Sequence, residues 1–362
     1  MLYKLLYPLR DIWFGFNVLK YITFRSAIAA VTAFFISLFI GRYVIDRLAN
    51  LQIWQNVRTS SCPGLIPLHQ QKQHIPSMGG LIILFAIIVP TLLWADLKNS
   101  YILIALTATV WFGLLGFLDD YLKLVKKKSS GLAVTTKLIG QIILGLLIGL
   151  YVFYHPDIST KLDIPFCKNC LIDLGIFYIL FAIVVIVGSS NAVNLTDGLD
   201  GLAIGCVVIA ALTYAGYSYV TGHAVISNYL QIPFIPKAGE LTVFCSCIIG
   251  AGLGFLWFNS YPATIFMGDT GSLALGGAIG IVAIFIKKEL LLLIVGGIFV
   301  AEALSVILQV TSFKLRGKRM FLVAPLHHHL QLKGWDEPKI TVRLWLIAII
   351  LALLSLATLK LR

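Results

Sequence analysis

The chain has 362 residues, of which 59% are hydrophobic and only 12% are charged, and its formal net charge is +12 at pH 7. A soluble domain carries about 25% charged residues, and a soluble surface this apolar would aggregate. The composition therefore excludes an ordinary soluble protein and predicts an integral membrane protein. The excess of basic residues predicts contact with anionic lipid headgroups or with anionic substrates.

Ten apolar segments are long enough to cross a bilayer as helices, because a helix needs about 20 apolar residues to span the hydrocarbon core. We therefore expect an all-α integral membrane protein with about ten transmembrane helices, built as one polytopic domain over residues 1–362. The predicted spans are 22–44, 78–95, 100–118, 136–154, 171–189, 199–220, 239–258, 270–287, 289–311 and 341–360.

Lysine and arginine concentrate in the odd-numbered loops between these spans. The two most basic stretches contain Lys123, Lys126, Lys127, Lys128 and Lys137, and Lys314, Arg316, Lys318 and Arg319. Since basic loops stay in the cytoplasm, we expect the odd loops to be cytoplasmic. Every unusual polar cluster lies in an odd loop or at a helix end that borders one, so the active site is expected at the cytoplasmic face.

The first polar cluster, HQQKQHIPSMGG, leads into the second span. Lys72 and Ser77, followed by Gly79 and Gly80, could hold an anion against a helix N-terminus. A glycine-rich helix start is also common in membranes, so both interpretations stay open here.

Two adjacent carboxylates, Asp119 and Asp120, close the third span in GFLDDYLK. Adjacent carboxylates repel and stay ionised only near cations, and Lys123 follows within reach on a helix. A solvated helix end is the simplest interpretation. The functional alternative is a divalent-metal site or a general base beside one.

Asn194, Asp197 and Asp200 are spaced three and three in NAVNLTDGLDG, so we expect them on one face of the first turns of the sixth span. A helix N-terminus tolerates carboxylates and offers free amides to phosphate, and Gly198 allows a ligand to approach closely. Simple capping explains one such residue and not three, which favours a functional site.

Asp269, in FMGDTGS, precedes the eighth span. It could be an ordinary N-cap. The alternative is a metal ligand, because Mg²⁺ takes one or two carboxylates together with substrate phosphate oxygens.

Three consecutive histidines, His327, His328 and His329, lie in a basic loop. Consecutive side chains on a helix diverge by about 100°, which makes one shared zinc ion a poor fit. Imidazoles that bond phosphate or sugar hydroxyls fit better, and a solvated loop is the alternative.

Acidic groups suited to Mg²⁺, basic loops, glycine-lined helix starts and histidines at one membrane surface suit phosphoryl-group chemistry between two anionic reactants, whose repulsion a metal and lysines offset. PSMGG, DDYLK, NAVNLTDGLDG, FMGDTGS and PLHHHL, in this order, resemble the bacterial phospho-N-acetylmuramoyl-pentapeptide transferases, of glycosyltransferase family 4 type. The resemblance covers nearly the whole chain. The triple histidine separates it from the related polyprenyl-phosphate N-acetylhexosamine-1-phosphate transferases, which are the closest alternative.

The resemblance implies a multi-pass enzyme of the bacterial cytoplasmic (inner) membrane, with its active site facing the cytoplasm and a homodimeric assembly. Such an enzyme transfers phospho-MurNAc-pentapeptide from UDP-MurNAc-pentapeptide to undecaprenyl phosphate with Mg²⁺, giving lipid I and UMP. This is the first membrane step of peptidoglycan synthesis and so belongs to cell wall biogenesis. Nucleic acid is not an expected partner.

The resemblance also assigns residues. Asp269 would be the Mg²⁺ ligand, with Asp120, Asn194 and Asp197 as further candidate ligands, and Asp119 and Asp120 would serve the lipid phosphate, Asp119 as the base. The uridine end of the substrate would be surrounded by Asn194, Asp197, Gly198, Leu199, Asp200 and Phe266. The phosphates and the sugar would be contacted by Lys72, Ser77, Lys123, Lys137, Asn259, His327, His328 and His329. The family usually has Gly-Thr-Pro-Thr where this chain has His74-Ile75-Pro76-Ser77, so Ile75 lacks the usual hydroxyl.

A cation- or proton-coupled transporter is the alternative from a different class. A transporter should carry acidic groups near mid-span, often on broken helices, whereas here they lie at span ends on one side. Glu302, near the middle of the ninth span, is the residue that fits a transporter. We interpret it instead as a packing or kink partner.

Overall fold

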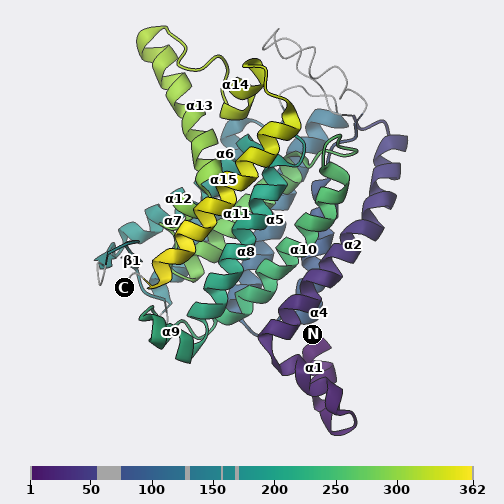
Figure 1. Ribbon diagram of the computed structural model, residues 1–362, viewed down its shortest axis with the longest axis vertical. Coiled ribbons are helices and arrows are strands. Elements are labelled where there is room, and N and C mark those ends of the chain that lie inside the picture. The colour runs from purple at the N-terminus through teal and green to yellow at the C-terminus, as the bar shows by residue number, and fades with distance from the viewer. Residues whose placement is uncertain (1, 55–74, 127–130, 156–157, 168–170, 361–362) are drawn as a thin grey trace.

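A computed structural model describes residues 2–54, 75–126, 131–155, 158–167 and 171–360. Long helices run side by side through a single bundle (Figure 1). They are α2 (Ile22–Asn50), α4 (Gly80–Trp94), α5 (Ser100–Leu124), α6 (Val134–Tyr154), α7 (Phe177–Thr196), α8 (Leu202–Thr221), α10 (Leu241–Asn259), α11 (Gly268–Phe285), α13 (Gly297–Arg316) and α15 (Glu337–Ala357).

Short elements cover the two ends of the bundle. Both chain termini, the β-hairpin and α9 lie towards one end, and α14 lies at the opposite end (Figure 1). The hairpin pairs β1 (Lys161–Asp163) with β2 (Leu171–Asp173) in antiparallel register. The other short elements are α1 (Leu2–Leu6), α9 (Ala224–Leu230), α12 (Leu292–Val295) and α14 (Leu326–Leu332), with 3₁₀ turns at Tyr7–Asp11, Phe14–Lys20, Ala238–Glu240 and Thr358–Lys360.

The all-α membrane fold expected from the sequence is confirmed. Within the described residues, nine helices are long and apolar enough to cross a membrane. The remaining expected span, 78–95, is the shorter apolar helix α4, which has 15 residues. At a rise of 1.5 Å per residue it is about 22 Å long, less than the roughly 30 Å hydrocarbon core. The count of ten spans therefore stays a prediction.

Two helices begin later than the sequence pattern indicates. The segment expected to span from 171 starts as strand β2, and α7 begins only at Phe177. The segment expected from 289 begins with a turn, and α13 starts at Gly297. Charge explains the second difference, because Lys287 pairs with Glu289 at 2.8 Å and Lys288 with Asp163 at 2.6 Å. Buried charges need such partners, and the chain turns to make them.

Helix α11 lies at the centre of the bundle, and every residue from Thr270 to Phe285 is buried. Its first turn is packed so closely that neighbouring helices present glycine there. A Cβ at Gly80 of α4 would lie 2.1 Å from the amide nitrogen of Gly271, and one at Gly116 of α5 would lie 2.2 Å from the carbonyl oxygen of Asp269. Membrane helices approach one another through small residues in this way, and the approach fixes where α11 begins.

We expect Gly116→Ala to destabilise the protein, because its methyl group would overlap the backbone of α11. Overpacking of this kind costs about 1–3 kcal/mol. Gly188→Ala is the matched control, because a Cβ at that position of α7 meets nothing within 4 Å and alanine favours a helix by about 1 kcal/mol over glycine. Thermal unfolding in detergent should show a lower midpoint for Gly116→Ala alone. Equal midpoints for the two variants would contradict the close approach.

Candidate active site

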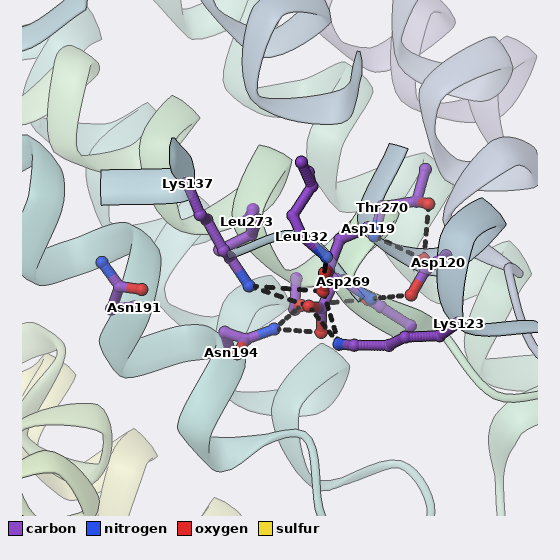
Figure 2. A network of polar contacts seen from close by, with 12 residues as sticks. Asp119, Asp120, Lys123, Leu132, Lys137, Asn191, Asn194, Asp269, Thr270 and Leu273 are labelled. Atoms are coloured by element: carbon purple, nitrogen blue, oxygen red, sulfur yellow. Dashed lines mark hydrogen bonds and ion pairs between the residues drawn. The ribbon is translucent and has the colours of Figure 1, made fainter. Parts of the chain in front are cut away.

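The side chain of Asp269 is the centre of a polar network that joins four helices (Figure 2). It projects from the first turn of α11, directly after Gly268, whose φ of +73° a side chain would disfavour. Its Oδ2 accepts from Lys123 of α5 at 3.1 Å and from Lys137 of α6 at 2.8 Å. Its Oδ1 accepts from the Asn194 amide of α7 at 2.8 Å. Residues separated by up to 146 positions thus meet at one carboxylate.

Asp119 lies beside Asp269 and shares the same two lysines. Its Oδ2 pairs with Lys123 and lies 3.8 Å from the Lys137 ammonium. Its Oδ1 accepts from the backbone amide of Leu132 at 2.7 Å, which ties the loop before α6 to the site. Two carboxylates this close, one buried and one half-buried, repel unless cations are present, and the two lysines balance them charge for charge.

Asp120 turns away from the lysines and binds the start of α11. Its Oδ1 accepts from the amide of Asp269 at 3.1 Å, and its Oδ2 accepts from the amide and the hydroxyl of Thr270 at 2.9 and 2.6 Å. A carboxylate from another helix thus does what an N-cap side chain does, and it also complements the positive end of the helix dipole. Both oxygens are occupied by α11, which separates Asp120 from its neighbour in role.

The expectation that Asn194, Asp197 and Asp200 line the first turns of a helix was wrong. Helix α7 ends at Thr196 and α8 begins at Leu202, so this stretch is a helix end followed by a loop. Gly201 explains the break, because its φ of +74° is a left-handed conformation that other residues rarely adopt. As a result the three side chains face different surroundings.

Within this stretch only Asn194 contacts Asp269 directly. Asp200 is buried and its Oδ2 accepts from the amide of Ala263 at 3.0 Å. Asn259 is also buried, accepting from the amide of Gly201 at 3.1 Å and donating to the carbonyl of Ile265 at 2.8 Å. Asp200 and Asn259 therefore fasten the loop before α11 to the start of α8.

The carboxyl of Asp197 is held in its protonated form over much of the neutral range. Burial raises its pKa to about 8, and repulsion from Asp269, Asp120 and Asp200 adds to this effect. A hydrogen bond with the Gly268 backbone opposes it. A bound cation would oppose this effect on Asp197, because it would favour the charged form of the carboxyl.

The PSMGG segment forms part of the wall around Asp269. The amide of Phe266 donates to the Pro76 carbonyl at 2.9 Å, and the amides of Gly79 and Gly80 donate to Phe266 and Met267 at 2.8 Å each. Ser77 is 6% exposed, Leu199 is buried and Phe266 is half-buried. Lys72 lies outside the described residues.

The three histidines face different partners, although the ring centroids of His327 and His328 lie 4.2 Å apart. His327 is completely buried and faces Gly198. His328 is 2.8 Å from Gln331 through its Nδ1, and the Nδ1 of His329 accepts from the amide of Leu322 at 3.2 Å. Only His327 therefore reaches the loop that carries Asp197.

Known proteins are similar to this chain over its whole length. A family model described as glycosyl transferase family 4 matches residues 102–287, which contain the whole network around Asp269. A protein of Citrifermentans bemidjiense and one of a Geobacter species, both named phospho-N-acetylmuramoyl-pentapeptide-transferase, are each 55% identical to this chain over 362 residues, covering 100% of both sequences. A protein of the same name from Thermodesulfovibrio yellowstonii is 53% identical over 365 aligned positions, again covering 100% of both.

The chain belongs to the phospho-N-acetylmuramoyl-pentapeptide transferase family. The resemblance read from the five motifs is thereby confirmed, and with it a multi-pass membrane protein of bacterial type. The transporter interpretation finds no support in these relatives.

The side chains around Asp269 include oxygen donors that suit Mg²⁺. Among the described residues no three His, Cys, Asp or Glu side chains group as a metal cage. Asp269 and Asp119 nevertheless place two carboxylates at one point, with Asn194 beside them. Magnesium is usually held by one or two carboxylates together with substrate phosphates and water, so the donor set fits an ion that arrives with a diphosphate.

Two contributors were missed by sequence reasoning. Thr270 holds Asp120, and Ser272 accepts from the Asn194 amide at 2.8 Å. Both follow Asp269 in FMGDTGS, where the simple expectation of an N-cap assigned them no contact across helices.

The raised pKa of Asp197 predicts a pH-dependent stability. An unfolded aspartate titrates near 3.9, so between about pH 4 and pH 8 the unfolded chain releases a proton that the folded chain keeps. Stability should therefore fall as pH rises through this window. Asp197→Asn has no proton to keep and should be more stable than the wild type at pH 8, on the order of several kcal/mol, and nearly equal to it at about pH 4 and below. Thermal unfolding with a metal chelator present measures this difference, and a difference that does not change with pH would contradict the pKa.

Proposed function

We propose that this protein transfers phospho-MurNAc-pentapeptide from UDP-MurNAc-pentapeptide to undecaprenyl phosphate, producing lipid I and UMP. The observation that carries the proposal is the four-charge cluster of Asp119, Asp269, Lys123 and Lys137, inside the segment that matches the family model. The names of the full-length relatives supply the substrate.

The ion pairs of the four-charge cluster can exchange partners when substrate binds. Without substrate, each lysine neutralises a carboxylate. A diphosphate that enters with a divalent cation brings both a negative and a positive group, so the lysines can turn to phosphate oxygens while the carboxylates keep a cation beside them. Bound Mg²⁺ would neutralise phosphate charge and act as a Lewis acid. Asp269 is the residue best placed to hold it, with Asp119 and Asn194 beside it.

Asp119 is the proposed base. It would accept the proton of the undecaprenyl phosphate, whose oxygen then forms a bond to the β-phosphorus of the UDP substrate as UMP leaves. The Leu132 amide and Lys123 hold its carboxylate in place, which supports a fixed direction for that proton transfer. Asp120 would act through α11, by keeping Asp269 in position.

The direct test supplies purified protein with UDP-MurNAc-pentapeptide, undecaprenyl phosphate and Mg²⁺ and measures UMP and lipid I. We expect Asp269→Asn to lose roughly 10²-fold or more in turnover while staying folded, because the lysines and the metal lose their shared carboxylate. Asp46→Asn, an exposed position of α2, is the matched control and should keep its rate. Transfer from UDP-N-acetylhexosamine but not from UDP-MurNAc-pentapeptide would instead favour the related hexosamine-phosphate transferases.

We also propose that the site faces the cytoplasm of a bacterial inner membrane. Lys123 of the site lies in the last turn of α5, and the basic ends of α5 and α13 lie at the α14 end of the bundle (Figure 1). Basic segments favour the cytoplasm. Cys167, next to the hairpin at the other end, is disulfide-bonded, which is usual on an oxidising side of the membrane. The homodimer expected from the resemblance stays a prediction.

Labelling with a membrane-impermeant thiol reagent in intact cells tests this orientation. In a background without the native cysteines, a cysteine at exposed Asp173 of β2 should react, and one at exposed Lys126 should react only after the cells are permeabilised. The reverse pattern would place the site on the outside and contradict the proposal.

A further inference from the structure

Glu302 and His327 form a buried pair that the proposed chemistry above does not use. Glu302 lies in the second turn of α13 and is 1% exposed, and His327, in the first turn of α14, is 0% exposed. One carboxylate oxygen, Oε2, accepts from the backbone amide of His327 at 3.3 Å and lies 3.2 Å from its ring Nδ1. The same oxygen thus bonds the start of α14 and lies beside the imidazole ring.

Several polar atoms of this buried pair lack hydrogen-bond partners. Within the described residues, Oε1 of Glu302 and both ring nitrogens of His327 have no hydrogen-bond partner, since the 3.2 Å contact at Nδ1 lacks hydrogen-bond geometry. Leaving a buried polar group unsatisfied costs about 1–3 kcal/mol, and more for a charged one. Such a group in a native protein calls for an explanation, and a catalytic role or a bound ligand, water or ion is one.

The unpartnered Nε2 is directed at the loop between α7 and α8. A Cβ at Gly198 would lie 2.2 Å from this nitrogen, so the ring reaches the backbone of the loop only because Gly198 has no side chain. That loop follows directly on Asn194, which bonds Asp269. The loop that Nε2 faces is therefore joined to the four-charge cluster through Asn194.

The half-buried carboxylate of Glu240 is bonded differently from that of Glu302. Glu240 accepts two bonds from Arg25, at 2.9 and 2.5 Å, and one from the amide of Asp96 at 3.0 Å. A role limited to structure would be served by such a closed pair. A carboxylate next to Nδ1 of a histidine instead fixes the tautomer of the ring and leaves Nε2 for another group.

We propose that Glu302 is a positioning residue of the transfer reaction: it holds His327 with Nδ1–H towards its carboxylate, so that Nε2 is presented to the diphosphate-linked sugar over Gly198. A small ring rotation completes the Nδ1 bond. This inference rests on the proposed function for the identity of the substrate, and on the buried geometry for the orientation of the ring.

The experiment has an arm that needs no activity. In ¹⁵N-histidine-labelled protein, the signal absent from His327→Gln belongs to His327, and its nitrogen shifts report the tautomer. We expect protonated Nδ1 in the wild type and a changed pattern in Glu302→Gln. Gln309→Ala is the matched control: Gln309 ties the same segment by accepting from the amides of Met320 and Phe321, at 3.0 and 2.8 Å, without contacting His327. It should leave the His327 signal unchanged. Protonated Nε2 in the wild type would overturn the proposal.

The kinetic arm separates positioning from stability. Glu302→Gln removes a buried charge and keeps the shape, so its melting temperature should equal or exceed that of the wild type. We expect kcat to fall about 10²-fold, with KM for the UDP substrate within threefold, and the double variant with His327→Gln to be no slower than His327→Gln alone. Multiplying defects, or a normal kcat, would overturn the inference. A wild type that releases no UMP would contradict the proposed function and leave the histidine spectra to decide the positioning.

Discussion

The position of one helix N-terminus controls the rest of the site. The first turn of α11 is enclosed by α4 and α5, and its free amides must find acceptors because water is excluded there. Asp120 supplies them from α5. Since Gly80 and Gly116 let the backbones come together, the contact is close enough to fix the direction of the Asp269 side chain. Each of the other polar groups is arranged around that fixed carboxylate.

The second constraint is that the charges of the four-charge cluster must balance. Asp119 and Asp269 lie against Lys123 and Lys137, so that each carboxylate has an ammonium partner. The lysines come from different helices, so the balance also fastens α5, α6 and α11 to one another. An arrangement that is neutral overall but made of exchangeable ion pairs can admit a metal–diphosphate without leaving a charge unpaired.

The two ends of the bundle use buried charge differently. Lys287, Lys288, Glu289 and Asp163 close on one another and anchor the hairpin below α11. At the α14 end, Glu302 and His327 stay open towards Gly198. A buried polar group needs a partner. At one end of the bundle the charged side chains are paired with one another, and at the other end polar atoms of Glu302 and His327 remain without partners among the described residues.

The sequence alone determined the membrane class and the acidic positions, because apolar runs of about 20 residues leave a polytopic bundle as the stable solution. Its five motifs also sufficed to indicate the transferase family. The role of each residue within a motif depended on the tertiary structure. Asp119 faces the lysines while Asp120 caps α11. Asn194 bonds Asp269, while Asp200 fastens a loop. Sequence spacing describes neighbours on one helix, whereas these contacts join helices up to 150 residues apart. The contact of Glu302 with His327 also depended on the tertiary structure. The two residues are 25 positions apart on different helices, and the packing of α13 against α14 brings them together.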